Sequence, residues 1–568
     1  MTPQSSGVRR GVINLSAGGA AIARLLKAEW PSLVLWAFLF SPQFARLLAD
    51  CQCAKIDLLV LYTFAISLLW LLAIRFISAN PFRVHLLLLP FYLLASIDLF
   101  VVLNFGSRLT AAYLYIALTN YKEATDFFAT YWRSVTGTLA LFALCYGVGL
   151  AGLHGRRQYR SKAMLALALG GLLLGYGAYF YKTVTLNSLS KGAVLDLLAK
   201  DQSTPVGYLS QLGLTAALYW ESKGYIEQRM ASQVNITRIS DQADLETLVF
   251  VIGESSRPHN WSLYGYPNST TPHLDQQAGL FKFKRMCTTA PYTSVAVPSL
   301  LSLYPIRDWK LIASNKSLVG ILRAAGYDTY WLSSQEVDSF GGIIPQIAAE
   351  AQYRQYLERS YDGALLPLLQ QMLGKADGRR QAVFIHIKGS HFEYARRFPS
   401  DFARFKPASG SQKDRIAADY DNSVLYTDWL LYSIMQTLAA GQRKALLVYA
   451  SDHGENLLDD SRELLGHGIG NQYDLATSAF VWSSGNLSPA QMAKLERLKA
   501  REDQQVSIGS LPHTLLNMAG ISMPGYDSTQ DLLSDDYKAS ECPHLLASGY
   551  VPSFNFDVKH IAVEKSGR

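Results

Sequence analysis

Five long apolar segments in the first third of the chain limit its possible folds more than any other feature. They lie at residues 30–48, 56–78, 84–105, 135–153 and 163–181. A helix needs roughly 20 residues to cross the hydrocarbon core of a bilayer. Hydrophobic residues make up 49% of the 568 residues and charged residues only 17%, and the apolar excess is concentrated in these segments. The sequence therefore predicts a helical bundle of about five transmembrane spans, followed by a large soluble portion.

Basic residues beside the apolar segments predict their orientation. Arg75 lies near the end of the second segment and Arg83 just before the third, and residues 154–162, between the fourth and fifth, carry four basic side chains besides a histidine. The positive-inside rule places these loops and residues 1–29 in the cytoplasm. Everything after the fifth span is then exported, which in a bacterium means the periplasm or the outer face of the inner membrane. The net charge is +7, and the basic residues cluster beside the apolar segments. This position favours contact with membrane lipids over binding to nucleic acid.

The remaining boundaries follow from changes in composition. The membrane domain is expected at residues 30–183, periplasmic linker helices at 184–245, a catalytic domain at 246–545 and a tail at 546–568. The loop at 106–133 mixes aromatic and charged residues. That mixture is typical of an amphipathic helix in the membrane interface and equally of an ordinary aromatic belt. Residues 208–229 have helical spacing and are expected to pack on the membrane surface or on the soluble domain.

Strand-like runs alternate with helical stretches after residue 246. The runs are at 247–252, 329–332, 382–387, 445–450 and 479–482. This alternation predicts βαβ units, and so an α/β/α domain with a mostly parallel sheet. Three of the runs lead directly to polar side chains, and ligands in such sheets bind just beyond the strand ends.

The polar residues beyond these strands suit a metal-dependent reaction. Glu254 follows the first strand, and Asp452 and His453 follow the fourth. Carboxylate and imidazole groups suit tetrahedral Zn²⁺. Thr293 precedes an apolar helix-like segment, where its hydroxyl could cap the helix or act as a metal-activated nucleophile. Each group alone has a structural explanation, and their recurrence after successive strands favours a site.

Four motifs carry a resemblance to a known family. They are Gly-Glu-Ser-Ser-Arg at 253–257, Leu-Tyr-Gly-Tyr-Pro at 263–267, Lys-Gly-Ser-His at 388–391 and Ser-Asp-His-Gly-Glu at 451–455. With the five spans, they resemble the phosphoethanolamine transferases of the alkaline phosphatase/sulfatase superfamily. The resemblance implies an alkaline phosphatase/sulfatase-like catalytic domain.

The resemblance also implies roles for individual residues. Zinc would be bound by Glu254, Thr293, Asp452 and His453, with Thr293 as the nucleophile and Thr288 and Thr289 as weaker candidates. His391 and His467 would be catalytic and contact the phosphoryl group, and Lys388 and Ser390 would join them in substrate binding. Whether the site holds one or two zinc ions is left open. Cys287 and Cys542 are the two cysteines of the exported portion, and a disulfide between them is possible.

The implied reaction is ping-pong. Phosphatidylethanolamine would donate phosphoethanolamine to Thr293 and release diacylglycerol, and a hydroxyl on a glycan or lipopolysaccharide would then accept the group. The lipid A branch usually has several disulfides, including one that brackets the nucleophile, which this chain lacks. The chain therefore looks closer to branches that modify lipopolysaccharide core sugars or periplasmic glucans, and a monomer is expected.

Four alternatives are weighed against this prediction. A lipid A transferase and a related phosphoglycerol transferase would share the spans and the metal ligands. A sulfatase would need a Cys or Ser followed by x-Pro-x-Arg, and no such sequence occurs near Thr293. A non-catalytic membrane sensor would not need the complete set of ligands.

Overall fold

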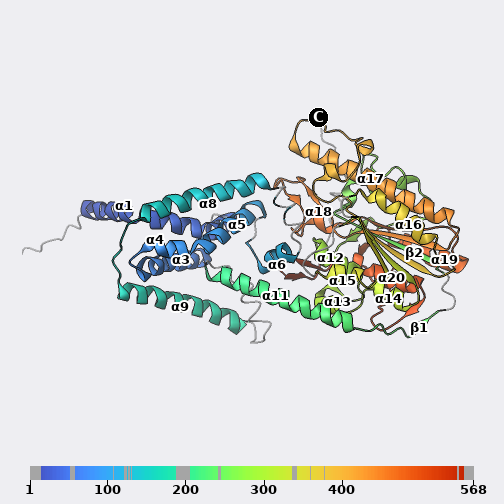
Figure 1. Cartoon of the computed structure of the whole chain (residues 1–568), viewed down its shortest axis with the longest axis horizontal. Coiled ribbons are helices and arrows are strands. Elements are labelled where there is room, and N and C mark those ends of the chain that lie inside the picture. The colour runs from blue at the N-terminus through green and yellow to red at the C-terminus, as the bar shows by residue number, and fades with distance from the viewer. Residues whose placement is uncertain are drawn as a thin grey trace, which may run out of the picture. The chain divides into compact units, whose positions relative to one another are not determined.

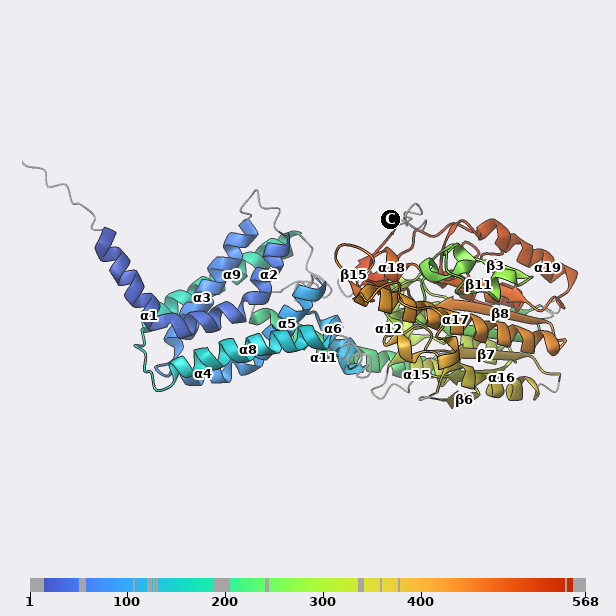
Figure 2. The same ribbon diagram turned by 90° about the horizontal axis from the view of Figure 1, so that it is seen from above.

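The computed structural model of the chain describes residues 15–50, 58–105, 108–119, 125, 128, 131–186, 205–240, 245–335, 342–357, 360–375, 378–546 and 549–554. The chain divides into two compact units (Figures 1 and 2). One comprises Met1–Ala111 with Tyr131–Leu214, and the other comprises Ala112–Thr130 with Thr215–Arg568. The finer domain boundaries expected from the sequence stay predictions.

The first unit is helical. Its main helices are α1 (Leu15–Leu39), α2 (Ser41–Asp50), α3 (Leu58–Ile77), α4 (Pro81–Leu87), α5 (Leu89–Phe105), α8 (Trp132–Leu153) and α9 (Lys162–Leu186). Helices thus occupy all five apolar segments. Within the described residues, α8 alone is an unbroken helix long and apolar enough to cross a membrane, and α4 with α5 passes the same test as a pair bent by 56°. The count of five spans stays a prediction.

Two of the expected spans are each divided between two helices. The segment at 30–48 is divided between α1 and α2, and the segment at 84–105 is divided between α4 and α5. Pro42 and Pro90 each occupy the second position of the helix that follows the break. Proline is tolerated in a first helical turn because its missing N–H has no intrahelical partner there, whereas deeper in a helix it removes a hydrogen bond.

A buried ion pair lies within the helical unit. Asp98 on α5 is fully buried and lies 2.7 Å from the guanidinium of Arg108. Its carboxylate also accepts hydrogen bonds from the backbone N–H of Leu109 and the hydroxyl of Tyr208. A buried carboxylate is tolerated only when such partners replace its lost hydration. This network ties the middle of α5 to the chain that follows the helix and to α11 (Val206–Ala231).

The expectations for the loop and linker have different outcomes. Of the loop at 106–133, the structure describes helix α6 (Ala111–Thr119) and a few further residues, so the two explanations of its composition stay open. The linker helix expected at 208–229 is confirmed as α11. In the second unit, Arg229 of α11 is buried and lies 2.6 Å from Glu350. The C-terminal end of α11 is therefore packed on the soluble domain.

A seven-stranded sheet forms the centre of the second unit, in the order β3-β11-β8-β2-β7-β5-β6. The strands are β2 (Thr247–Gly253), β3 (Leu280–Lys282), β5 (Asp328–Ser333), β6 (Tyr353–Tyr356), β7 (Gln381–His386), β8 (Ala445–Ser451) and β11 (Ala479–Ser483). All five strands expected from the sequence are present. The five strands from β8 to β6 are parallel, whereas β11 runs antiparallel to both β8 and β3. The mostly parallel sheet is confirmed.

Helices cover both faces of this sheet (Figure 1). Alternate residues of β2 enter different cores, with Phe250 on one face and Val251 on the other, as the two-residue period of a strand requires. The helices on the Phe250 face are α12 (Thr293–Leu300), α13 (Trp309–Ser314), α14 (Leu318–Ala324), α15 (Ile343–Ala348), α19 (Pro489–Glu496) and α20 (Leu511–Met518). The helices on the opposite face are α16 (Leu365–Leu373) and α17 (Gln412–Ala440).

Short elements complete the unit. They are helix α18 (Gln472–Leu475) and the paired strands β1 (Arg238–Ile239) with β13 (Ile521–Ser522), β4 (Arg285–Cys287) with β12 (Gln505–Ser507), β9 (Asn456–Leu457) with β10 (Leu465–Gly466), and β14 (His544–Leu546) with β15 (Gly549–Val551).

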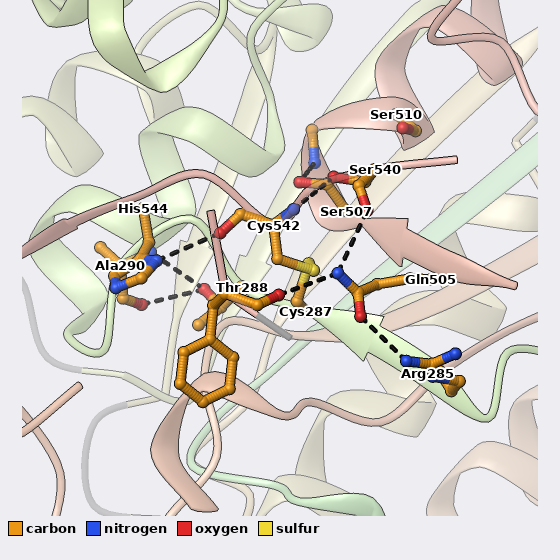
Figure 3. Close-up of a disulfide and its surroundings, with 12 residues drawn as sticks. Arg285, Cys287, Thr288, Ala290, Gln505, Ser507, Ser510, Ser540, Cys542 and His544 are labelled. Carbon is orange, nitrogen blue, oxygen red and sulfur yellow. Dashed lines mark hydrogen bonds between the residues drawn. A yellow bond between two sulfur atoms is a disulfide. The ribbon is translucent and has the colours of Figure 1, made fainter. Parts of the chain in front are cut away.

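Cys287 and Cys542 form a disulfide across a sequence separation of 255 (Figure 3). Cys287 ends β4, six positions before Thr293, and both cysteines are buried. Near the bridge, the backbone N–H of Leu545 donates to the carbonyl of Thr289. The disulfide therefore holds the C-terminal segment against the chain that leads to Thr293, and it resolves the pairing that the sequence left open. Cys51 and Cys53 lie outside the described residues.

Candidate active site and metal centre

The register of three parallel strands brings the candidate groups together. Gly253 at the end of β2 pairs with Ser451 at the end of β8, and Ile252 pairs with His386 at the end of β7. Glu254, Asp452 and Lys388 follow these ends within two residues. Because parallel strands end at one edge of the sheet, side chains that are remote in the sequence meet there.

Glu254, Asp452 and His453 form a buried group that could hold a metal ion. Their potential ligand atoms all lie within 4.8 Å of one another, and none of the three side chains is more than 1% exposed. Nε2 of His453 lies 3.4 Å from Oε1 of Glu254 and 3.4 Å from Oδ2 of Asp452. Glu254 was expected as a ligand together with the other two, and the three side chains do meet.

The hydrogen bonds of Asp452 leave one carboxylate oxygen for a metal. Oδ1 accepts from the backbone N–H groups of Ser255 and His453 at 3.2 and 2.7 Å. Oδ2 is buried and accepts no hydrogen bond from the described residues. A buried acceptor without a donor is costly, and a bound cation is one way in which proteins satisfy such an atom. The donor set, two carboxylates and an imidazole, is of the type that zinc prefers.

The ring of His453 is held in the state that a metal needs. Nδ1 lies 2.8 Å from the carbonyl oxygen of Gly454, so Nδ1 carries the hydrogen and Nε2 presents a lone pair. Burial lowers the pKa of His453 below its usual value, which favours the neutral ring. A glycine is needed at position 454, since a Cβ there would lie 2.1 Å from the carbonyl oxygen of Tyr473.

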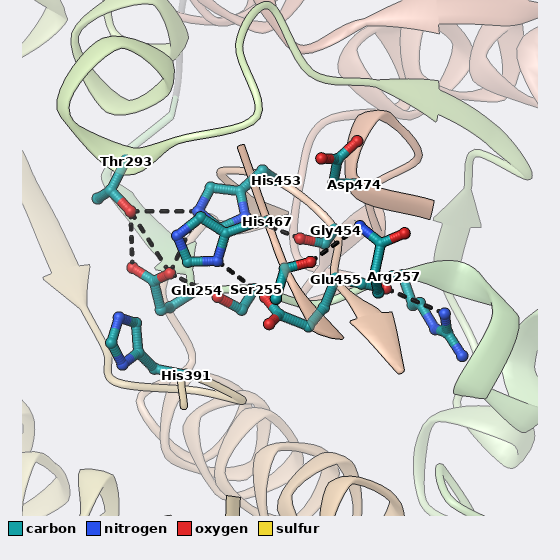
Figure 4. Close-up of polar contacts among 12 residues, drawn as sticks. Glu254, Ser255, Arg257, Thr293, His391, His453, Gly454, Glu455, His467 and Asp474 are labelled. Carbon is teal, nitrogen blue, oxygen red and sulfur yellow. Dashed lines mark hydrogen bonds and ion pairs between the residues drawn. The ribbon is translucent and has the colours of Figure 1, made fainter. Parts of the chain in front are cut away.

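Thr293 faces this group from across the site (Figure 4). Its Oγ1 lies 3.2 Å from Oε2 of Glu254 and 3.2 Å from Nε2 of His453. Thr293 is the first residue of α12, and Tyr292 is the N-cap, with no side-chain capping bond. The hydroxyl therefore turns to the carboxylate and the imidazole instead of capping the helix. The hydroxyl of Thr288, by contrast, donates to the carbonyl of Ala290.

His467 and His391 lie beside the metal-ligand group (Figure 4). The ring centroid of His467 is 4.2 Å from that of His453 and 6.1 Å from that of His391. Nδ1 of His467 lies 3.0 Å from Oε2 of the buried Glu455, whose other oxygen accepts from the hydroxyl of Tyr394. This carboxylate fixes the orientation of the imidazole.

A second group that could hold a metal shares His453 with the first. It consists of His453, Glu455 and His467. The structure thus offers ligands for one or two ions, and the number stays open.

Besides His391, Lys388 and Ser390 of the Lys-Gly-Ser-His motif were expected to bind substrate, and the structure shows what each of these two contacts. The backbone N–H of Lys388 donates to Ser334 and to Asp362. Ser390 is buried, and its hydroxyl accepts from Ser423 on α17. Gly389 between them has φ +49°, and a Cβ there would lie 2.8 Å from the carbonyl oxygen of Glu254. The motif therefore packs closely under Glu254, and the substrate contacts of Lys388 and Ser390 stay predictions.

Sequence reasoning assigned no role to two polar side chains that support the site. The amide of Gln335 donates to Oε2 of Glu254 at 3.1 Å and to the carbonyl of Ile387 at 3.0 Å. Glu455 orients His467, as described above. Gln335 follows β5 by two residues, so the rule that pointed to the ends of the other parallel strands would have found it. Glu455 was visible within its motif, but its partner His467 lies 12 positions later.

Residues 246–521 match a protein-family model described as Sulfatase. This part of the chain is a sulfatase-family domain. The phosphoethanolamine transferase EptC from Escherichia coli strain RS218 is 28% identical over 314 residues, which cover 51% of this chain and 54% of that relative. The match thus spans about half the length of this relative. The resemblance to phosphoethanolamine transferases that the motifs indicated is confirmed.

Two solved structures show that the fold is shared. The C-terminal periplasmic domain of E. coli EptC in complex with Zn has a TM-score of 0.52 and 24% identity, covering 56% of this chain and 96% of that chain. The integral membrane protein lipooligosaccharide phosphoethanolamine transferase A (EptA) from Neisseria meningitidis has a TM-score of 0.65 and 20% identity, covering 94% of this chain and 99% of that one. The alkaline phosphatase/sulfatase-like fold of the sulfatase domain is confirmed.

Proposed function

We propose that this chain is a membrane-bound phosphoethanolamine transferase that uses Thr293 as its nucleophile. The observation that carries the proposal is the position of the Thr293 hydroxyl, 3.2 Å from both Glu254 and His453 and at the start of a helix. A helix N-terminus favours an approaching phosphate. The choice of phosphoethanolamine rests on the relatives that carry this name.

Zinc is the metal that these residues fit. Glu254, Asp452 and His453 would bind it, together with the hydroxyl oxygen of Thr293. When bound, zinc would lower the pKa of that hydroxyl and stabilise negative charge on the phosphoryl oxygens. The zinc complex of the E. coli EptC domain supports this choice. Oδ2 of Asp452, which accepts no hydrogen bond from the described residues, supports it independently.

The first half-reaction would transfer the group to the protein. Oγ1 of Thr293 forms a bond to the phosphorus of phosphatidylethanolamine while the bond from phosphorus to the glycerol oxygen breaks. Thr293 loses its proton, and the departing diacylglycerol needs one. We propose that His391 and His467 contact the phosphoryl oxygens and carry that proton. The product is a phosphoethanolamine ester of Thr293.

The second half-reaction would restore Thr293. A hydroxyl of the acceptor attacks phosphorus while the bond from phosphorus to Oγ1 breaks, and the proton that the acceptor hydroxyl loses replaces the one that Oγ1 of Thr293 gave up in the first half-reaction. We propose that the acceptor is a sugar of the lipopolysaccharide core or of a periplasmic glucan. The support is the absence of a short disulfide around Thr293, since Cys287 pairs instead with the distant Cys542.

A lipid donor requires a site near the bilayer. We propose that five spans anchor the chain in the bacterial inner membrane with the catalytic domain in the periplasm and that the enzyme works as a monomer. The whole-chain likeness to an integral membrane protein supports the anchor, as do the apolar α8 and the bent pair α4–α5.

A comparison of two labelled lipid donors tests the proposal. The purified full chain, in detergent, would be mixed with phosphatidylethanolamine labelled in its head group, or with phosphatidylglycerol labelled in the same way. We expect labelled protein and released diacylglycerol with the first lipid only. Labelling by phosphatidylglycerol alone would identify a phosphoglycerol transferase. Mass spectrometry of lipopolysaccharide and glucans from a deletion strain tests the acceptor, and loss of phosphoethanolamine from lipid A alone would contradict a sugar acceptor.

A further inference from the structure

Ser255 adopts a backbone conformation that is unfavourable for its side chain. It follows Glu254 directly, is fully buried, and has φ +53°. Left-handed φ values are costly for residues with a Cβ, and glycine adopts them freely. Strained residues of this kind persist where surrounding contacts hold them, and they cluster at functional sites. A serine at this position therefore points to a use for its hydroxyl.

Ser255 contacts both carboxylates of the proposed metal site. Its hydroxyl donates to Oε1 of Glu254 at 2.8 Å, and its backbone N–H donates to Oδ1 of Asp452 at 3.2 Å. Through Ser255, these two bonds connect the side chains of Glu254 and Asp452, which are 198 positions apart and directly follow the neighbouring strands β2 and β8. The bond to Asp452 uses Oδ1 and leaves Oδ2 without a donor among the described residues.

The turn at Ser255 is held from its other side. The hydroxyl of Tyr420 on α17 donates to the carbonyl of Ser255 at 2.7 Å and accepts from the backbone N–H of Arg257 at 3.1 Å. The backbone N–H of Ser390 donates to the carbonyl of Glu254 at 3.0 Å. The backbone of the turn is thus held by contacts that do not involve the Ser255 hydroxyl. Removing that hydroxyl should therefore remove one of the hydrogen bonds that orient the Glu254 carboxylate without dismantling the turn.

We propose that Ser255 is a positioning residue that orients Glu254 and Asp452 toward one metal ion. This inference rests on the proposed zinc site and adds a residue that neither the ligand set nor the reaction includes. The hydroxyl limits the rotation of the Glu254 carboxylate, and the backbone N–H limits that of Asp452. Outer hydrogen bonds of this kind set ligand geometry, and their loss typically weakens metal binding by about 10- to 100-fold.

Two substitutions separate positioning from a purely structural role. Ser255→Ala removes the hydroxyl but keeps a Cβ at the unfavourable φ. Ser255→Gly also removes the hydroxyl, and glycine adopts this φ without a penalty. Ser317→Ala is the matched control, because Ser317 is also a buried serine whose hydroxyl donates to a carboxylate, that of Glu350. The measurements are the zinc dissociation constant, by chelator competition, and the thermal midpoint of the full chain in detergent without zinc.

We expect both Ser255 variants to bind zinc about 10- to 100-fold more weakly, with Ser255→Gly unfolding at a higher temperature than Ser255→Ala. Ser317→Ala should lower the midpoint and leave the zinc constant unchanged. Wild-type affinity in both Ser255 variants would overturn the positioning role, provided that Asp452→Ala loses zinc in the same assay. If the wild-type chain itself bound no zinc, the metal site and the role of Ser255 would both be rejected.

Discussion

The hydroxyl of Thr293 lies 3.2 Å from Nε2 of His453, although the two residues are 160 positions apart. Thr293 begins α12 and His453 follows β8, so the sheet and the helix packed on it set this distance. An unassisted threonine hydroxyl is a poor nucleophile at neutral pH. Its approach to a neutral imidazole and a buried carboxylate distinguishes it from Thr288, whose hydroxyl donates to the carbonyl of Ala290.

Replacing Thr293 should abolish transfer while the protein still folds. Loss of a nucleophile has cost roughly 10⁶ in rate in another enzyme, and we expect Thr293→Ala to approach that loss. Thr293→Ser should keep some activity because the hydroxyl remains. Thr289→Ala is the control, since the Thr289 hydroxyl is buried without a hydrogen bond among the described residues. Peptide mass spectrometry should find the phosphoethanolamine adduct on Thr293, and an adduct on Thr288 or Thr289 would reassign the nucleophile.

Asp452→Ala should lose zinc and activity together. Asp452 contributes the one buried carboxylate oxygen of the group that accepts no hydrogen bond from the described residues. Zinc content per chain, measured by elemental mass spectrometry, should fall toward zero. Asp428→Asn is the control, because Asp428 is a buried carboxylate that accepts from the backbone of His273 and Leu274 instead. Full activity after exhaustive chelation would contradict a zinc mechanism.

Acidification should destabilise the domain through His386. Burial lowers the pKa of His386 from 6.5 to about 4. Between these values the unfolded chain binds a proton that the folded chain does not, so stability is present above pH 6.5 and is lost as the pH falls toward 4. The full loss is about 3 kcal/mol. His386→Asn should show a shallower fall in thermal midpoint from pH 6.5 to 4.5, and parallel curves would disprove this linkage.

Breaking the disulfide should destabilise the second unit. Removal of a native disulfide typically costs about 2–5 kcal/mol, largely by freeing the unfolded chain. Cys287 and Cys542 close a loop of 255 positions, and Cys542→Ser should lower the thermal midpoint under oxidising conditions. Cys145→Ser controls for the loss of a thiol, because Cys145 is not bridged. An unchanged midpoint in Cys542→Ser would argue against the bridge.

Reporter fusions should show the orientation in the membrane. Alkaline phosphatase is active only after export, so a fusion after Arg568 should be active and a fusion after Arg160 inactive. The basis is the basic loops at 75–83 and 154–162, which favour the cytoplasm. The opposite pattern of activity would reverse the proposed topology.

Much of the fold could be predicted from local sequence patterns. The strand at 247–252 and the other four expected strands are present because continuous apolar runs are buried on both faces of a parallel sheet. The antiparallel direction of β11 was not predictable in this way, since a short apolar run reads alike in either direction. The breaks before Pro42 and Pro90 depend on where the following helix begins, which hydropathy averaged over about 20 residues does not resolve.

The sequence by itself determined the candidate metal ligands, because motifs at strand ends are local. Glu254, Asp452 and His453 were identified from their positions after apolar runs. Only the tertiary structure decided how these groups are used. It turned Thr293 toward His453 instead of the helix end, paired Cys287 with Cys542, and placed Gln335 and Ser255 against Glu254. Each of these contacts depends on sheet register and helix packing, which join residues too distant in the sequence for any local pattern to relate.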